Sequence, residues 1–296
     1  MKIRELEKEG IESLQGAMVP NADVDARLLM LHVLGISVHE YLLRSSDEAS
    51  DELSGRYRDL IVKRCRRIPL QHITGRAEFM GLTFRVNKTV LCPRPDTEIL
   101  VETVLEYMKK RFTGDDESEI RVLDLCTGSG CILSSILKLA PGTCGIKSSR
   151  ITGVGSDISE DALDLAAGNA FACGIDGSRV DFRQGDLFSV LEAGELFDII
   201  VSNPPYIPAH IIPELMPEVR DHEPIGALDG GEDGLVFYRR ITEGAAAHLK
   251  DGGMLFYEIG FDQRQDVSDI MRDHGFLNIE CRKDLSNNDR VVYGHL

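Results

Sequence analysis

The sequence lacks the features that mark membrane, secreted and metal-binding proteins. In its 296 residues no apolar run approaches membrane-spanning length, and the N-terminal stretch MKIRELEKEG is charged and helix-like rather than signal-like. The seven cysteines form no CxxC pair and have no histidine at metal-ligand spacing. We therefore expect a cytoplasmic protein with reduced thiols, no membrane contact and no bound metal.

Positive charge is also scarce over most of the chain. Residues 1–90 carry 14 Lys/Arg and 13 Asp/Glu, which leaves 19 basic against 36 acidic side chains for residues 91–296. Proteins that bind nucleic acid depend on neutralising its phosphates, so this acidic portion argues against wrapping DNA or RNA. We expect no direct binding of nucleic acid, although a local basic patch is compatible with these counts.

The N-terminal part predicts a small helical bundle. Apolar residues recur at helical spacing in residues 3–18, 26–34, 39–43 and 47–67. The basic stretch 56–67 ends this part; it is either a solvated helix end or a surface that faces a partner. Residues 71–87 have the glycine turns and period of a β-hairpin. We expect a helical domain over residues 1–70, a β-hairpin linker over 71–95 and an α/β domain over 96–296.

In the third of these parts, strands and helices alternate, as in a doubly wound sheet. An exposed loop is expected at 114–119. The predicted strands are 120–125, 151–156, 179–184, 197–202, 253–258, 276–282 and 290–295. The predicted helices are 98–111, 130–139, 160–172, 234–249 and 262–274. Five parallel strands followed by an antiparallel terminal hairpin match the Rossmann-like, seven-stranded sheet of class I methyltransferases better than a dinucleotide dehydrogenase.

The turn after the first predicted strand favours a nucleoside ligand without a pyrophosphate. Gly128 and Gly130 let the backbone approach a ligand at a helix N-terminus. Leu133 stands where a dinucleotide site wants a third glycine, and the carboxylate of Asp124 would repel a pyrophosphate. The same carboxylate suits the cationic amino-acid end of S-adenosylmethionine. The turn residues assigned to this cofactor are Asp124, Cys126, Thr127, Gly128, Ser129 and Gly130.

Two more acidic residues follow the next two predicted strands. Asp157 is placed to accept hydrogen bonds from the ribose hydroxyls, and Asp186 is placed to accept one from the adenine amino group. Leu187 or Phe188 is placed to cover the adenine ring. Each acid alone is equally compatible with a helix cap. Three acids at the ends of three successive strands instead outline a nucleoside site, and we predict S-adenosyl-L-methionine as the cofactor.

The fourth strand ends in Asn203-Pro204-Pro205-Tyr206. The prolines remove two backbone donors and keep the chain extended, so carbonyl oxygens remain available beside an Asn amide. By itself this is compatible with an ordinary strand-ending turn. Opposite a methyl donor, it suits a planar NH2 group whose two hydrogens need acceptors.

This tetrapeptide resembles the (N/D/S)PP(Y/F) motif of amino-methyltransferases that act on adenine N6, guanine N2 or glutamine N5. The chain as a whole resembles the PrmC/HemK family, the protein-(glutamine-N5) methyltransferases of peptide chain release factors. The stretches that carry this resemblance are 67–81, 92–100, 124–132, 203–207, 223–241 and 258–263. It implies methylation of the glutamine in the Gly-Gly-Gln loop of class 1 release factors.

The resemblance also implies roles for particular residues. Asn203 to Tyr206 hold the glutamine, and the segment Pro93, Arg94, Pro95 lines its approach. The N-terminal helices dock the release factor, which gives the basic stretch 56–67 a partner-facing role. The sequence departs from the family at Cys126, where glycine is common, and at Leu187, where an aromatic residue is common.

Three alternatives remain open from the sequence. The segment 223–234 is either a surface loop or part of the glutamine pocket. A nucleic-acid amino-methyltransferase acting on adenine N6 or guanine N2 is a rival function, but it would need to extract a base and bind phosphate with an acidic domain. A catalytically silent methyltransferase fold that only binds a partner is the second rival; the complete set of glycines and acids argues against it.

Overall fold

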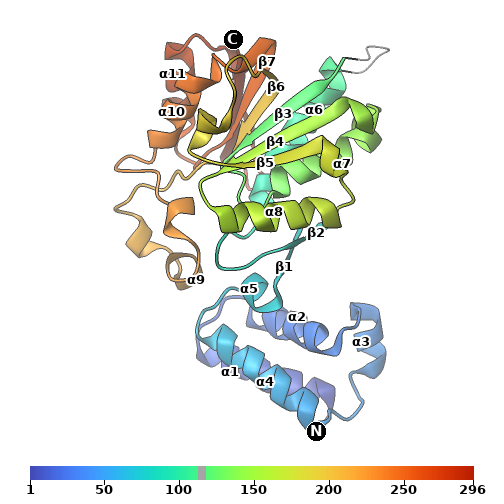
Figure 1. Cartoon of the computed structure of the whole chain (residues 1–296). Helices are drawn as coiled ribbons and strands as arrows, with labels where there is room; N and C mark the ends of the chain where they lie inside the picture. Colours follow the sequence, from blue (N-terminus) through green and yellow to red (C-terminus); the bar gives the residue numbers. More distant parts are fainter. Residues whose placement is uncertain (113–117) are drawn as a thin grey trace. The chain divides into compact units, whose positions relative to one another are not determined.

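The computed structural model describes residues 1–112 and 118–296, and most of the loop expected at 114–119 lies outside them. The chain divides into two compact units, which we describe separately (Figure 1). One unit comprises Met1–Arg76 together with Met216–His222. The other comprises Ala77–Leu215 and Glu223–Leu296.

The first unit is helical, as predicted. Its helices are α1 (Ile3–Gly16), α2 (Ala22–Leu34), α3 (Val38–Arg44), α4 (Asp51–Cys65), α5 (Leu70–Thr74) and α9 (Pro217–Arg220). The α2 helix ends where Gly35 takes a left-handed conformation. The α4 helix starts later than expected because the side chain of Ser50 caps it by accepting from Leu53 N. Residues 70–74 form a helix, so the prediction that the hairpin begins at 71 is wrong.

Buried ion pairs join the inserted segment 216–222 to the other helices of this unit. The guanidinium of Arg64 lies 2.6 Å from Asp25 and 2.9 Å from Glu218, and Arg67 also pairs with Glu218. Burial opposes ionisation of Glu218, but hydrogen bonds from Arg67 and Arg64 outweigh it and lower its pKa to about 2. Because Arg64 is only 5% exposed, this one residue of the basic stretch 56–67 is not available to a partner.

In the described part of the chain, no single helix is long and apolar enough to cross a membrane. By length and composition alone, the bent pair α2 and α3, which meet at 87°, passes such a test together.

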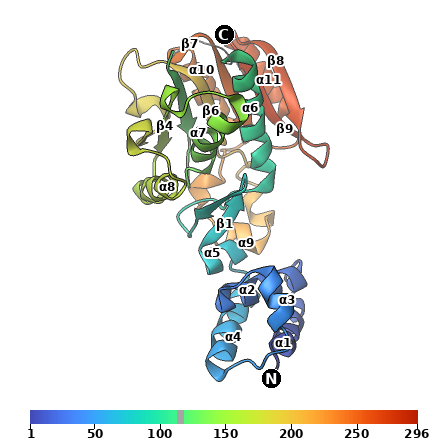
Figure 2. The ribbon, with the colours of Figure 1, turned by 90° about the vertical axis from the view of Figure 1, so that its right-hand side faces the viewer.

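The second unit is built on a seven-stranded sheet in the order β5-β4-β3-β6-β7-β9-β8. The strands are β3 (Ile120–Leu125), β4 (Ile151–Asp157), β5 (Val180–Gln184), β6 (Phe197–Ser202), β7 (Leu249–Glu258), β8 (Leu277–Lys283) and β9 (Asp289–His295). The first five are parallel, and β9 pairs antiparallel with both β7 and β8 (Figure 2). The predicted class I methyltransferase architecture is confirmed.

Helices cover both faces of this sheet. They are α6 (Glu98–Arg111), α7 (Cys131–Cys144), α8 (Glu160–Ala172), α10 (Val236–Ala245) and α11 (Arg264–Asp273). Successive residues of β3 pack on opposite sides: Val122 joins a core with α6 and α7, whereas Leu123 joins one with α10 and α11. A two-stranded sheet of β1 (Arg76–Phe79) and β2 (Leu82–Arg85) precedes α6. The 3-10 helices are η1 (Pro95–Thr97), η2 (Ser148–Arg150), η3 (Gly177–Arg179), η4 (Leu187–Val190), η5 (Ile212–Glu214) and η6 (Ile225–Ala227).

The strand register brings the predicted site residues to one edge of the sheet. Leu125 of β3 is level with Ser156 of β4 and Ser202 of β6. The residues that follow therefore leave the sheet side by side, at the carboxyl ends of parallel strands. This is where open α/β sheets bind their ligands.

Candidate active site

A cavity of about 440 Å³ lies at this edge of the second unit. Its volume falls in the range of roughly 300–1,000 Å³ that is typical of small-molecule sites. The predicted site residues that line it are Cys126, Thr127, Gly128, Ser129, Asp157, Asp186, Leu187, Asn203, Pro205, Pro93 and Arg94. Those that do not line it are Asp124, Gly130, Phe188, Pro204, Tyr206 and Pro95.

The turn between β3 and α7 is fixed by the neighbouring strand. The backbone N of Gly128 donates to Asp157 Oδ2 at 2.9 Å, and that of Thr127 donates to the Ser156 carbonyl at 3.0 Å. Gly130 caps α7 in a left-handed conformation, and an added Cβ would lie 2.8 Å from the Cβ of Ala166. A glycine is therefore required at 130 for the packing of α7 against α8.

Asp124 lies beneath this turn and is completely buried. Its Oδ2 accepts from the Thr127 hydroxyl at 2.6 Å, whereas Oδ1 has no hydrogen-bond partner within the described residues. Burial raises the pKa of Asp124 to about 7. The structure thus gives Asp124 a contact with the turn, from below the cavity wall.

The next two acids are held differently from one another. Asp157 is half-buried, and its Oδ1 accepts from Ser159 N at 3.0 Å. Asp186 is exposed and forms an ion pair of 2.6 Å with Arg240, which also lines the cavity. Sequence reasoning missed Arg240 because it lies on α10, far along the chain from Asp186. Both acids still face the cavity from neighbouring strands.

Leu187, and not Phe188, lines the cavity beside Asp186. The ring of Phe188 is instead stacked on His248, with centroids 5.1 Å apart. The same ring packs against Gly244 of α10, where an added Cβ would lie 2.5 Å from it. Of the two side chains that the sequence offered to cover the adenine, the structure supports Leu187.

The Asn-Pro-Pro-Tyr corner borders the other side of the cavity. The half-buried Asn203 donates from Nδ2 to the hydroxyl of Thr97 at 3.4 Å. Tyr206 contributes through its backbone, since its carbonyl accepts from Gln263 Nε2 at 3.0 Å. Gln263 also accepts from Gly260 N at 2.9 Å, so it ties the corner to the end of β7.

The segment 223–234 packs against this corner and is not a free surface loop. Ile207 N donates to the Leu228 carbonyl, and Gly230 N donates back to the Ile207 carbonyl. Side chains at Gly230 and Gly234 would collide with the backbone of Tyr206, at 2.8 and 2.4 Å. Of the two sequence interpretations, the structure therefore favours the role in shaping the pocket.

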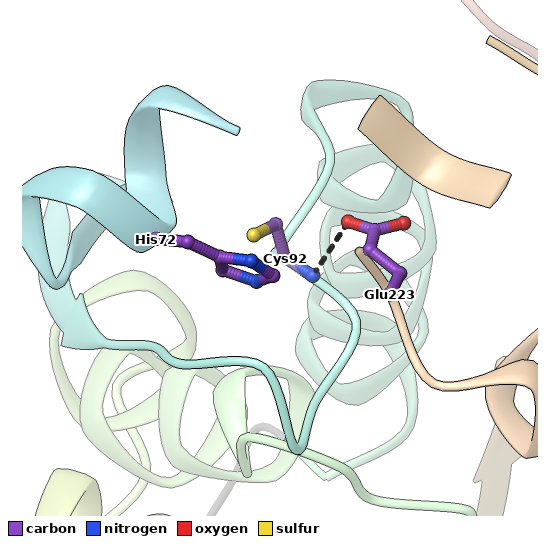
Figure 3. A group of neighbouring side chains, drawn as sticks. All are labelled: His72, Cys92 and Glu223. Carbon is purple, nitrogen blue, oxygen red and sulfur yellow. Dashed lines mark hydrogen bonds between the residues drawn. The ribbon is translucent and has the colours of Figure 1, made fainter. Parts of the chain in front are cut away.

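Glu223 holds the segment that contains Pro93 and Arg94. Its carboxylate accepts from the backbone N of Cys92 at 3.3 Å (Figure 3) and pairs with Arg94 at 2.5 Å. Burial raises the pKa of Glu223, opposed by the nearby charge of Arg94. Pro95 instead starts η1 on the surface.

Glu258, an acidic residue beside the Asn-Pro-Pro-Tyr corner, was not predicted from the sequence to have a function. Glu258 ends β7 and is buried, and its Oε2 has no hydrogen-bond partner among the described residues. Burial raises its pKa to about 7, although hydrogen bonds with Thr97 and Asn203 oppose the shift. Glu258 lies in a stretch that carried the family resemblance, but nothing in the local pattern indicated that it would reach Asn203.

The cavity residues fit S-adenosylmethionine. Asp157 offers a carboxylate to a ribose, and Leu187 offers an apolar surface to a base. Gly128 has open space where a side chain would stand, so a ligand can approach its backbone. Asp124 keeps an unpaired buried oxygen close to the turn, which suits a positively charged group nearby.

The fold and the cavity define a class I methyltransferase that uses S-adenosylmethionine. Residues 116–233 match the family model described as "Methyltransferase domain". The solved structure titled "Crystal structure of hMettl16 catalytic domain in complex with MAT2A 3'UTR hairpin 1" gives a TM-score of 0.54 at 13% identity, over 85% of this chain and 83% of that chain. At this identity the likeness concerns the fold alone.

The particular family follows from closer relatives. Residues 5–75 match the family model described as "PrmC N-terminal domain". The "Release factor glutamine methyltransferase" of Agrobacterium fabrum is 42% identical over 94% of this chain and 92% of its own. That of Clostridium acetobutylicum is 44% identical over 90% and 89%. The chain belongs to the release factor glutamine methyltransferase family, which confirms the resemblance found in the sequence.

Proposed function

We propose that this protein transfers a methyl group from S-adenosylmethionine to the side-chain amide nitrogen, N5, of the glutamine in the Gly-Gly-Gln loop of class 1 release factors. The names of its relatives support a release factor as substrate. The observation that carries the assignment is the placing of Asn203 and Pro205 in the wall of the cofactor cavity. An acceptor held there faces the methyl donor.

Asn203 and Pro204 orient the acceptor nitrogen. An amide nitrogen is a poor nucleophile because its lone pair is delocalised into the carbonyl group. The Asn203 side-chain oxygen and the Pro204 carbonyl accept its two hydrogens and aim the nitrogen at the donor. Bound S-adenosylmethionine supplies an electrophilic methyl group. The proton leaves the nitrogen after transfer, so the mechanism demands no catalytic histidine.

The other side of the cavity binds the cofactor. Asp157 accepts the ribose hydroxyls, Leu187 covers the adenine, and Asp186 accepts from the adenine amino group while paired with Arg240. Pro93 and Arg94 line the approach of the glutamine, in a segment that Glu223 holds in place. The open space at Gly128 lets the donor approach the backbone of the turn.

We assign docking of the release factor to the helical unit, Met1–Arg76 with Met216–His222, and catalysis to the unit formed by Ala77–Leu215 and Glu223–Leu296. A cytoplasmic location follows from such a substrate. Of the basic stretch 56–67, the exposed Arg66 and Lys63 remain available to a partner. The acidic charge of the catalytic part disfavours the rival acceptors, adenine and guanine in nucleic acid.

The deciding experiment supplies the purified protein with labelled S-adenosylmethionine and a bacterial class 1 release factor. We expect one label on the factor, mapped by mass spectrometry to the Gly-Gly-Gln glutamine. A factor whose glutamine is replaced by asparagine is the matched control and should stay unlabelled. Label on DNA or ribosomal RNA, with none on the factor, would overturn the assignment.

A further inference from the structure

Among the residues that the structure describes, Glu258 is the buried acid at the acceptor corner that the proposed mechanism does not use. Ser202 of β6 is in register with Tyr257 of β7, so Asn203 and Glu258 are the next residues along two neighbouring strands. Both leave the sheet at the edge that holds the cavity. Burying a carboxyl oxygen without a hydrogen-bond partner lowers the stability of the protein. Such a residue next to Asn203 is therefore a candidate for a function at the acceptor corner.

Several groups surround the Glu258 carboxyl. The polar side chains of Thr97 and Asn203 lie close enough to favour its ionised form and so oppose the rise of its pKa. The hydroxyl of Tyr238 donates to its backbone carbonyl at 2.9 Å. The titratable and charged groups that interact electrostatically with it come from four elements and the loop after β6; they are Asp96, Cys131, Tyr206, Tyr238 and Arg290.

Thr97 links the two residues chemically. As the N-cap position of α6 it makes no capping hydrogen bond, so its hydroxyl is free for other partners. That hydroxyl accepts from Asn203 Nδ2 and has one hydrogen of its own to donate. An ionised carboxylate only accepts, so an ionised Glu258 takes the Thr97 hydrogen and leaves Thr97 able only to accept from Asn203.

We propose that Glu258 is a positioning residue that, through Thr97, fixes the orientation of the Asn203 side-chain amide. The ionised carboxylate directs Nδ2 toward Thr97 and so turns Oδ1 toward the cavity, where the acceptor nitrogen needs a hydrogen-bond acceptor. This inference rests on the proposed function for the use of Oδ1. The orientation itself is a property of the free protein.

Protonation of Glu258 reverses this order. A protonated carboxyl donates to Thr97, and the Thr97 hydrogen is then free to donate to Asn203 Oδ1. The amide can flip and present its own NH2 group to the substrate NH2, which it cannot bind. Since the pKa of Glu258 lies at about 7, kcat should rise as the pH increases through neutrality.

The first test measures the amide directly, without turnover. In 15N-labelled protein the side-chain signals of Asn203, identified by their loss in Asn203→Ala, should shift as the pH is raised from 6 to 8. The shift should vanish in Glu258→Gln. Signals that titrate equally in Glu258→Gln, or stay fixed in the wild type, would refute the inference whatever the substrate proves to be.

The second test separates positioning from stability. Thr97→Val and Glu258→Gln should each lower kcat at pH 8 by about two- to tenfold, the worth of one hydrogen bond, with the cofactor dissociation constant unchanged. Thr97→Ser keeps the hydroxyl and should retain the wild-type rate. If Thr97→Val unfolds, Thr97→Ser and the wild type still give the pH profile, and a flat wild-type profile counts against the proposal.

Glu195→Gln is the matched control. Glu195 is a mostly buried carboxylate that pairs with Arg121 and Arg183 away from the cavity. The Glu195→Gln substitution should lower the free energy of unfolding and leave the pH dependence of kcat unchanged. If the wild type methylates no release factor while the Asn203 signals titrate as described, the proposed function fails and the positioning role stands. If methylation occurs and every variant matches the wild type, only the positioning role fails.

Discussion

The two sides of the cavity are built in different ways. On the cofactor side, the Asp157 carboxylate accepts from the backbone N of Gly128 and Ser159, and the Ser156 carbonyl of the adjacent strand accepts from Thr127 N. On the acceptor side, Asn203 and Tyr206 depend on the side chains of residues remote in sequence. A cofactor site made largely of backbone and local caps can be recognised from a short motif, whereas the acceptor site needs the assembled fold.

The largest effect should come from the acceptor side. Asn203→Ala removes the oxygen that accepts from the glutamine NH2 group, and kcat should fall by about 10²- to 10³-fold, as for the loss of one preorganised polar group. Steady-state kinetics with a release factor measures this. The cofactor dissociation constant, measured by calorimetry, should remain within about twofold. An equal collapse of cofactor binding would mean that the two sides are not independent.

Asp157→Ala tests the cofactor side and should show the opposite pattern. Loss of charge-assisted hydrogen bonds to the ribose should raise the cofactor dissociation constant by roughly 100-fold. At saturating cofactor, kcat should stay within a few fold of the wild type. The control Asp164→Ala removes an exposed carboxylate from α8 and should change neither quantity. A drop in kcat that saturating cofactor does not restore would contradict the division of roles.

The sequence predicts the fold, and most of the predicted cofactor residues line one cavity, for a physical reason. Alternating apolar strands and helices define the doubly wound sheet, and the acids at strand ends are fixed to one edge by the register. The pattern does not predict the direction in which each single side chain points. Asp124 and Phe188 follow the pattern of ligand residues, but their side chains turn into the protein.

Contacts between distant segments could not be predicted from one sequence. Thr97, Arg240 and Glu258 lie on three different elements. No spacing rule brings Thr97 and Arg240 to the cavity, or Glu258 to the strand beside Asn203. Arg64 shows the same limit in the helical unit. Its basic neighbours suggested a surface, whereas the fold buries it between Asp25 and Glu218.

Gln263→Leu probes how far the acceptor corner depends on one remote amide. Gln263 is buried and satisfies the Tyr206 carbonyl and Gly260 N. Leaving these groups unpaired should lower the free energy of unfolding by about 2 kcal/mol and raise the KM for the release factor, measured by urea titration and initial rates. Gln265→Leu, on the exposed face of the helix α11 that follows Gln263, should change stability by less than about 0.5 kcal/mol. Equal effects in the two variants would refute the special role of Gln263.

The smallest effect should come from the cofactor turn, where Cys126 has a φ of 60°. A residue with a side chain is strained in this left-handed region by about 1–2 kcal/mol, and glycine is not. Burial raises the pKa of the thiol, so Cys126 is inert at neutral pH. Cys126→Gly and Cys126→Ala both remove the sulfur, but only glycine relieves the strain, and the flexibility of unfolded glycine offsets part of the gain. The free energy of unfolding of the glycine variant should therefore be about 0.5–1 kcal/mol higher than that of the alanine variant. If the alanine variant is the more stable one, the left-handed conformation at residue 126 costs no measurable stability, and the prediction of strain in the cofactor turn is refuted.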